Sequence, residues 1–439
     1  MGSIAFDGGS TADVPTIPAM EAAFAAAVKS SKIPGAVVMA KNTTGTIDYA
    51  RCFGARTVRR DETRRLPPME EDTPMRFASA TKLLTSIMAL QCVDRGLIGL
   101  DEDVEKIIPD LTSMKVLAGF DDAGNAIMRD REGIITLRHL LTHTSGLSYV
   151  LINPLLQQYM SKGYLPAADK FGIQSRLAPP PVNDPGVEWM YGSNLDWAGR
   201  LVERATGMDL ESYMQENLCD PLDIIDMTFK LQQRPDLLAR RADQTQRSRE
   251  DGKLVYDDTV YFRQDGEECF GGQGIFTSPE SYMKVLFSLL KNDGVLLKPD
   301  TVKLMFQPAL DERLEKQMNA HMDSATHINY GGPMPMTGLR RNFGLGGIIP
   351  MEDLDGDKWR RKGSMTLGGG PNIIWVRFFS SASGIARHAD TFFSNHLQQI
   401  DPAAGLCTLV TYQLEPWNDP ICRGLTQTFE KAIYASLPK

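Results

Sequence analysis

The sequence predicts a mixed α/β protein of the α+β type, in which an antiparallel sheet is flanked by helices from both ends of the chain and a mostly helical region is inserted. Three patterns support this prediction: a helix and two strands at the start, a long middle block with helical periodicity, and short apolar runs between glycine-rich or Asp-Pro turns towards the end. We expect a sheet domain at 1–75 and 260–439 and a helical domain at 76–259, with the functional site in the cleft between them.

The first elements are a helix and a hairpin. The stretch A-M-E-A-A-F-A-A-A-V-K-S-S places apolar residues along one helical face and stops at Pro34-Gly35. Two strands, A-V-V-M-A and I-D-Y-A-R-C, flank the connection K-N-T-T-G-T, and this polar, glycine-containing connection is typical of a hairpin.

The later elements follow from the same two periodicities. In the middle block we expect helices at Lys82–Arg95, Leu137–Thr142, Leu195–Ala205 and Leu210–Asn217. Beyond this block we expect a helix at Glu280–Lys291, strands at Phe343–Ile349, Asn372–Val376 and Leu406–Leu414, and a closing helix at Cys422–Tyr434.

Composition and charge exclude several classes of function. The chain has 439 residues, 42% of them hydrophobic, which is enough for a large core. A net charge of -8 argues against nucleic acid and membrane as partners, because both require a positive surface. The 6 cysteines lack paired spacing and no apolar run is long enough for a bilayer, so we expect a cytoplasmic protein with no metal or cofactor.

One lysine stands out in the middle block. Lys82 is the single charged residue between Phe77 and Val93, and the residues after it are apolar on nearly every side, as in a helix that crosses a core. Ser79 lies three residues earlier, so both side chains share one helical face. This is the S-x-x-K pattern of serine acyl-transfer enzymes. The same spacing occurs at three other places in the chain. We expect Ser281/Lys284 and Ser288/Lys291 to lie on a solvated helix face, and Ser436/Lys439 stands at the end of the chain.

Two interpretations of this pair stay open on the residues alone. A buried ammonium is costly unless it is paired, and desolvation lowers the pKa of a lysine, so such a group can act as a base. It would activate the Ser79 hydroxyl as a nucleophile, and backbone N–H groups at the start of the helix would hold an oxyanion. Alternatively, Lys82 is structural and reaches a carboxylate or carbonyl groups, and Ser79 is a helix N-cap.

Two longer motifs, R-F-A-S-A-T-K-L-L-T and L-R-H-L-L-T-H-T-S-G-L, resemble those of the serine β-lactamase/penicillin-binding-protein-like esterases. The resemblance covers nearly the whole chain and implies the fold of that family, with Ser79 as nucleophile and Lys82 as base. Its second element, a tyrosine after a Pro-Gly turn, is matched by D-P-G-V-E-W-M-Y-G-S-N at Tyr191, whose phenol would relay protons. The usual pattern is Tyr-x-Asn, whereas Asn194 comes one residue late, so the role of the asparagine is not transferred.

The third element of the family, Lys-Thr-Gly on a strand, is altered in this chain. In K-G-S-M-T-L-G-G-G-P-N-I-I-W its place is taken by Leu367-Gly368-Gly369. That lysine is implicated in holding the β-lactam carboxylate, so its absence disfavours antibiotic hydrolysis. The resemblance implies that Gly368 and Gly369 let substrate approach the backbone, and that the N–H of Gly370 completes an oxyanion hole with that of Ser79. A β-bulge that requires glycine is compatible with this role.

Further stretches resemble a subgroup of that family, the fungal acyltransferases of statin biosynthesis: R-C-F-G-A-R-T-V-R-R-D-E, K-F-G-I-Q-S-R-L-A-P-P, D-G-E-E-C-F-G-G-Q-G and Q-L-E-P-W-N-D-P. This resemblance implies that Ser79 takes a 2-methylbutyryl-like group from an acyl-carrier-protein thioester and passes it to a polyketide hydroxyl. Arg176 and Trp417 fall in stretches that match the acceptor pocket of the subgroup. As isolated residues, the first would more often form a surface ion pair and the second a core contact.

An arginine-rich segment predicts a partner without any resemblance. Its arginines are relieved only by Asp61 and Glu62, in a chain that is acidic overall. They are Arg51, Arg56, Arg59, Arg60, Arg64 and Arg65. Such a patch would dock an acidic acyl carrier protein and steer association, and the resemblance implies that this is a domain of a polyketide synthase. A solvated hairpin with scattered ion pairs explains the same residues as well.

The segment from Val376 to Gln398 interrupts an expected hairpin between N-I-I-W and L-C-T-L-V-T-Y. It shows no clear period, and codons for its ends can be read as splice sites. We therefore interpret it as a translated intron that is tolerated at a hairpin tip, and sequencing of a mature transcript that retains these codons would refute this.

Rival functions share most of these residues. A hydrolytic esterase would keep Ser79, Lys82 and Tyr191 and differ only by admitting water to the acyl-enzyme. A non-catalytic binding protein would carry these motifs unused. A different type of serine hydrolase is disfavoured because no G-x-S-x-G elbow occurs, and because His139 and His143 are predicted to be structural.

Overall fold

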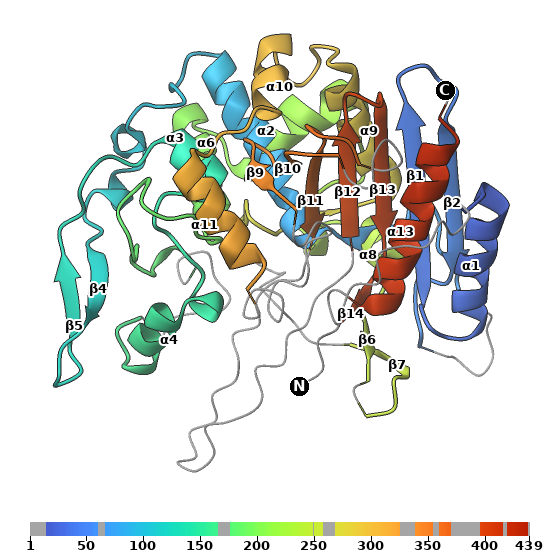
Figure 1. The fold of residues 1–439 in the computed structure, drawn as a ribbon, viewed down its shortest axis with the longest axis horizontal. Coiled ribbons are helices and arrows are strands. Elements are labelled where there is room, and N and C mark those ends of the chain that lie inside the picture. Colours follow the sequence, from blue (N-terminus) through green and yellow to red (C-terminus); the bar gives the residue numbers. More distant parts are fainter. Residues whose placement is uncertain are drawn as a thin grey trace.

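An antiparallel sheet of 7 strands forms the centre of the protein (Figure 1). The computed structural model describes residues 15–59, 66–165, 176–248, 250–257, 268–324, 339–353, 360–369, 396–415 and 419–437. Across the sheet the strands follow the order β2-β1-β13-β12-β11-β10-β9. Their bounds are β1 Gly35–Asn42, β2 Asp48–Gly54, β9 Arg341–Phe343, β10 Ile348–Pro350, β11 Met365–Gly369, β12 His396–Asp401 and β13 Leu406–Thr411. The predicted fold class is confirmed.

The sheet joins strands from the two ends of the sequence. β1 pairs with β13 in an antiparallel register that sets Val37 opposite Thr411 and Lys41 opposite Cys407. On its other side β1 pairs with β2, the second strand of the predicted hairpin. A strand made within the first 42 residues is therefore held between its neighbour in sequence and a strand more than 360 residues later.

The terminal helices cover one face of this sheet. Helices α1 (Ile17–Lys29) and α13 (Pro420–Ala435) lie side by side against it (Figure 1). Phe24 of α1 and Phe429 of α13 join Val38 of β1 in one buried cluster. The apolar face of each helix therefore finds its partner on the sheet, as the amphipathic pattern predicted.

Helix α9 (Pro279–Lys291) contacts β1, β12 and β13. Here Val37 and Met39 of β1 belong to the same buried cluster as Met283 of α9, whereas Val38 belongs to the cluster of the terminal helices. Alternate residues of a strand point to opposite faces of a sheet, so β1 is buried on both sides.

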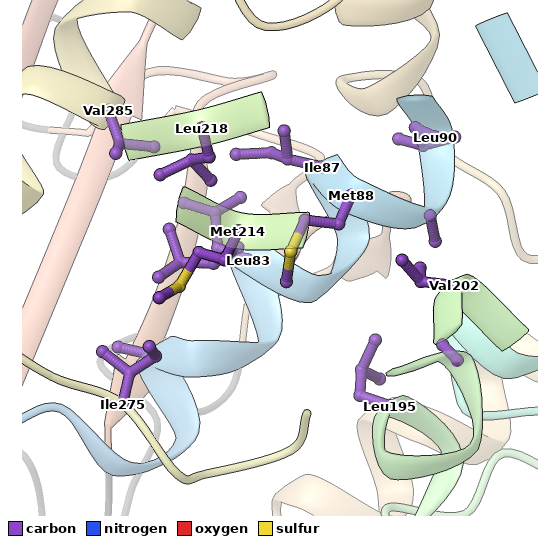
Figure 2. Close-up of a cluster of buried hydrophobic side chains, with 14 of the residues drawn as sticks. Leu83, Ile87, Met88, Leu90, Leu195, Val202, Met214, Leu218, Ile275 and Val285 are labelled. Atoms are coloured by element: carbon purple, nitrogen blue, oxygen red, sulfur yellow. The ribbon is translucent and has the colours of Figure 1, made fainter. Parts of the chain in front are cut away.

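Helix α2 (Thr81–Asp94) runs through the interior of the protein (Figure 2). All of its residues from Thr81 to Cys92 are buried. Figure 2 shows apolar side chains of α2 together with those of α6 (Asn194–Thr206), of α7 (Leu210–Met214) with the turn after it, and of α9. They include Leu83, Ile87, Met88, Leu90, Leu195, Val202, Met214, Leu218 and Val285. The prediction that the helix of Lys82 crosses a core is confirmed.

The remaining elements are short and complete the helical region and its edges. The other helices are α3 Leu137–Thr142, α4 Pro154–Ser161, α8 Pro235–Arg240, α10 Pro299–Met305 and α11 Glu312–Met322. Small sheets are formed by β3 Met75–Arg76 with β8 Phe276–Thr277, by β4 Val116–Phe120 with β5 Ala126–Arg129, and by β6 Thr245–Arg247 with β7 Leu254–Tyr256 and β14 Leu414–Glu415. Within the described ranges, no helix combines the length and the apolar character that crossing a membrane requires.

One predicted strand differs from the structure. The strand expected at Phe343–Ile349 is wrong, because β9 ends at Phe343 and β10 begins at Ile348. A turn separates them, in which the N–H of Gly344 donates to the carbonyl of Gly347 at 2.8 Å. The strand expected at Asn372–Val376 lies outside the described residues.

The proposed insertion 376–398 is described only at its end. Its last three residues, 396–398, belong to β12 and pair with β11, where Leu397 stands opposite Gly368. The predicted end of the insertion at Gln398 thus falls within β12, and the interpretation as a translated intron stays a prediction. The domain boundaries expected at 75/76 and 259/260 stay a prediction.

Candidate active site

Ser79 lies in a turn between a short strand and the buried helix α2. The turn is a 3-10 helix at Ala78–Ala80. The side chain of Gln413 fixes the strand before it, since it accepts the N–H of Arg76 at 3.4 Å and donates to the carbonyl of Arg76 at 3.3 Å. Ala78 has a φ of 47°, in the left-handed region that disfavours residues with a Cβ. No side chain caps this turn or α2, so the interpretation of Ser79 as an N-cap is wrong.

Lys82 is buried, with 3% of its surface exposed, and it reaches two oxygens. Its Nζ donates to the carbonyl of Gly272 at 2.6 Å and to Ser79 Oγ at 3.2 Å. No carboxylate in the described part of the chain lies within ion-pair distance of this amine. Lys82 therefore makes both contacts: it reaches a backbone carbonyl, as expected of a structural lysine, and it reaches the serine, as expected of a base.

Tyr191 completes the cluster from a distant part of the chain. Its hydroxyl donates to Ser79 Oγ at 2.9 Å, across a separation of 112 residues. Its ring centre lies 4.7 Å from Lys82 Nζ. Ser79 and Tyr191 are half-buried. The structure thus brings together all three residues that the sequence singled out.

The loop that follows α3, with the sequence H-T-S-G-L, holds the segment that ends at Tyr191. The N–H of Met190 donates to the carbonyl of His143 at 2.7 Å, and the N–H of Gly186 donates to that of Thr144 at 2.7 Å. The hydroxyl of Ser148 donates to the carbonyl of Tyr191 at 3.3 Å. This loop and Ser148 directly after it therefore set the position of Tyr191, through two backbone hydrogen bonds and one side-chain hydrogen bond.

His143 is wholly buried behind Tyr191. Its ring centre lies 4.7 Å from that of Tyr191, and it also contacts the rings of Trp189 and Phe343. Burial, with a smaller effect of the Lys82 charge, holds the pKa of His143 well below its usual range. The imidazole is therefore neutral at physiological pH and packs as an aromatic ring, consistent with its predicted structural role.

Replacing His143 with asparagine should reduce the loss of stability on acidification. Because the pKa is lower in the folded state than in the unfolded state, stability is complete above about pH 6.5 and falls below it by up to about 1.4 kcal/mol per pH unit. Asparagine does not titrate and tolerates the left-handed backbone of this residue, whose φ is 61°. Denaturant unfolding followed over several pH values should give a shallower slope for His143→Asn; equal slopes would contradict this assignment.

Asn194 does not lie at the serine. It begins α6, where it is buried and its Oδ1 accepts the hydroxyl of Ser145 at 2.5 Å. Its Nδ2 donates to the carbonyl of Leu147 at 3.0 Å. Asn194 thus ties the loop after α3 to α6.

Arg176 lies next to the cluster, through the ring of Tyr149. Its Cζ is 4.7 Å from the centre of this ring, and Lys82 Nζ is 5.7 Å from the same centre. Arg176 is buried, so it is not the surface residue of the alternative interpretation. Trp417, the other residue expected in the acceptor pocket, lies outside the described residues.

The glycine-rich strand borders the serine turn. Gly368 and Gly369 end β11, which contacts the 3-10 turn that carries Ser79. Leu367, in the place of the family lysine, is buried in the sheet and supplies no cation. Gly370, expected to complete the oxyanion hole, lies outside the described residues.

Three of the six clustered arginines are described, and each has a partner within the chain. Arg51 pairs with Glu21 at 3.1 Å, and Arg59 pairs with Asp243 at 2.8 Å. Arg56 donates to a backbone carbonyl at 2.7 Å. Arg60, Arg64 and Arg65 lie outside the described residues. These ion pairs agree with the alternative of a solvated hairpin and leave the docking role as a proposal.

Sequence reasoning missed three residues around Lys82, namely Tyr149, Asp196 and Gly272. Gly272 stands in the quoted motif D-G-E-E-C-F-G-G-Q-G, and Asp196 comes two residues after the quoted motif that ends at Asn194. The double glycine was a usable signal, because a Cβ on Gly272 would lie 2.8 Å from Asp196 Oδ2. No local pattern distinguished Tyr149 from other tyrosines.

The fold and this arrangement are those of the β-lactamase/transpeptidase-like class. An antiparallel sheet flanked by terminal helices borders a serine that contacts a lysine and a tyrosine. The Beta-lactamase family model matches residues 20–373, and the chain belongs to this family.

Two curated proteins and one solved structure are similar to this chain over nearly its whole length. The chain is 67% identical over 435 residues to monacolin J acid methylbutanoyltransferase of Aspergillus terreus, covering 99% of each chain. It is 68% identical to ML-236A carboxylate methylbutanoyltransferase of Penicillium citrinum, covering 95% of this chain and 94% of that protein. The unliganded structure of simvastatin synthase from Aspergillus terreus matches with a TM-score of 0.86 and 67% identity, over 96% of this chain and 98% of that one. The resemblance to statin-pathway acyltransferases is confirmed.

Proposed function

We propose that this protein is a serine acyltransferase that moves a short branched acyl group, of the 2-methylbutyryl type, from an acyl-carrier-protein thioester to a hydroxyl of a statin-type polyketide. The names of the two curated relatives, both methylbutanoyltransferases, support the acyl group and the type of acceptor. The observation that carries the proposal is the contact of Ser79 Oγ with both Lys82 Nζ and the Tyr191 hydroxyl.

In the first half-reaction, Ser79 Oγ attacks the carbonyl carbon of the thioester. Its proton passes to the Lys82–Tyr191 pair, whose nearest atoms lie 3.2 Å and 2.9 Å away. The N–H groups of Ser79 and Gly370 stabilise the oxyanion. The C–S bond then breaks, the sulfur takes up the proton, and the acyl group remains on Ser79 as an ester.

In the second half-reaction, the acceptor hydroxyl attacks the acyl-serine. Its proton passes to the same pair, and the C–O bond to Ser79 breaks as that oxygen regains a proton. Arg176, Gly368, Gly369 and Trp417 are the proposed acceptor contacts. A guanidinium suits a carboxylate, so Arg176 fits acceptors that are acids, as the names of both relatives indicate. Hydrolysis differs only in the nucleophile, which is water.

Measuring the intact mass of the protein after incubation with a small acyl thioester tests this proposal. We expect an adduct of one acyl group that persists in water and is discharged when the polyketide alcohol is added. Ser79→Ala should form no adduct, whereas Ser281→Ala, in another S-x-x-K pair, should behave as the wild type. Rapid loss of the adduct in water would identify an esterase, and no adduct at all would contradict the proposal.

The carrier-protein donor is tested by comparing two thioesters of the same acyl group. Arg51→Glu combined with Arg60→Glu should slow transfer from the carrier protein and leave transfer from a small thioester unchanged, because only the carrier senses the patch. Lys291→Glu with Lys303→Glu changes the net charge equally on exposed residues elsewhere and serves as control. Equal effects of the arginine variants on both donors would exclude docking by this segment.

A further inference from the structure

The proposed chemistry leaves a buried carboxylate beside the base without a role. Asp196 lies in the first turn of α6, five residues after Tyr191, and 1% of its surface is exposed. Its Oδ1 accepts the N–H of Gly272 at 2.9 Å, and its Oδ2 accepts the hydroxyl of Tyr149 at 3.5 Å. A buried carboxylate is costly, and removing either partner of a buried polar network is more costly still.

Gly272 links this carboxylate to the base. While its N–H is held by Asp196, its carbonyl accepts the Lys82 ammonium at 2.6 Å. The glycine is pressed against the carboxylate and against Tyr149, since a Cβ on it would lie 2.8 Å from Asp196 Oδ2 and 3.0 Å from the Tyr149 hydroxyl. A shift of Asp196 therefore moves the carbonyl that orients Lys82 towards Ser79.

Tyr149 links the carboxylate to both cations of the site. The centre of its ring lies 5.7 Å from Lys82 Nζ and 4.7 Å from Arg176 Cζ, and its ring meets that of Tyr191 edge-on at 5.8 Å. Burial, helped by the charge of Asp196, raises the pKa of Tyr149 well above its usual range. Tyr149 is thus a neutral phenol that donates its hydrogen to Asp196.

We propose that Asp196 is a positioning residue for the acyl transfer, and this inference rests on the proposed function. Its carboxylate fixes the Gly272 carbonyl and the Tyr149 ring, so that Lys82 points at Ser79. Its contact with the Gly272 N–H also places a negative charge on the far side of the peptide whose carbonyl holds Lys82.

Among the residues that the structure describes, the other side chains around Lys82 carry no negative charge. Tyr149 and Tyr191 are phenols, the buried imidazole of His143 is neutral, and Arg176, on the ring of Tyr149, is a cation. Asp196→Asn therefore takes a negative charge away from the surroundings of the Ser79–Lys82 contact. The acid limb of the rate–pH profile should move to lower pH.

The test measures the rate of adduct formation on Ser79 from a small acyl thioester as a function of pH. In Asp196→Asn we expect acylation to slow by about tenfold or more at the wild-type optimum, and the acid limb to move down by about one pH unit. Thr85→Val releases the neighbouring carbonyl of Gly271, which Thr85 Oγ1 contacts at 2.6 Å, without changing any charge. Thr85→Val should slow acylation but leave the acid limb of the rate–pH profile at its wild-type pH.

A second control separates this role from a general effect on α6. Glu203 of the same helix also accepts a backbone N–H, that of Leu210 at 3.2 Å, so Glu203→Gln should change neither the rate nor the limb. If Asp196→Asn folds and the acid limb of its rate–pH profile stays at the wild-type pH, the inference is overturned. If the wild-type protein itself forms no adduct, the proposed function is overturned instead. If Asp196→Asn does not fold, Tyr149→Phe removes one donor to the same carboxylate, and a wild-type rate in that variant overturns the inference.

Discussion

Lys82→Met should slow acylation of Ser79 by about 10²–10⁴-fold, the range typical of losing a general base. The amine is the group that receives the serine proton in the proposed reaction, and its Nζ lies 3.2 Å from Ser79 Oγ. Methionine matches the length of the lysine stem and favours helix, and α2 is buried among apolar side chains, so we expect the variant to fold. The rate of adduct formation, followed by mass, measures the effect directly.

A matched control for this variant lies in the same chain. Lys284 also follows a serine by three residues, but its Nζ donates to the carbonyl of Asp223 at 2.6 Å. Lys284→Met should therefore acylate at the wild-type rate. If Lys82→Met forms the adduct as fast as the wild type while denaturant unfolding shows it to be folded, another group takes the serine proton and the proposed mechanism is wrong.

Gly146→Ala should destabilise the protein by about 3 kcal/mol or more, because it combines backbone strain with a clash that no side-chain rotation relieves. Gly146 has a φ of 84°, and a Cβ there would lie 2.0 Å from the backbone oxygen of Asn183. Its carbonyl also accepts the N–H of Val182 at 2.9 Å. The glycine of the H-T-S-G-L loop therefore permits the close approach of the segment that leads to Tyr191.

Gly133→Ala separates the two contributions. Gly133 has a φ of 79°, close to that of Gly146, but a Cβ on it would meet nothing within 4 Å. Strain alone should cost about 1 kcal/mol there. Urea unfolding of both variants gives the difference, and equal losses would show that the loop moves aside to accept the methyl group.

The sequence predicted this site where local patterns carry information. The spacing of Ser79 and Lys82 is a property of one helical turn, and the apolar run after it predicted that the helix is buried. Tyr191 entered through the resemblance of the motif around it. Each of these residues could be named because its neighbours in sequence already restrict its surroundings.

The remaining contacts depend on how distant segments pack. Asp196 meets Gly272 across 76 residues, and Lys82 meets Gly272 across 190 residues. No periodicity encodes such a meeting, because it requires that α2, α6 and the Gly271–Gly272 turn already be in place. The strand predicted at Phe343–Ile349 failed for a related reason: an apolar run does not reveal that Gly344 to Gly347 reverse the chain.

The pairing of β1 with β13 has a consequence for biosynthesis. While the ribosome is still making the middle of the chain, β1 has β2 on one edge and an open ladder on the other, because Val37 must wait for Thr411. The nascent polypeptide therefore carries a strand edge with unpaired backbone N–H and C=O groups through most of translation, and the sheet beside the serine closes only when β13 has left the exit tunnel.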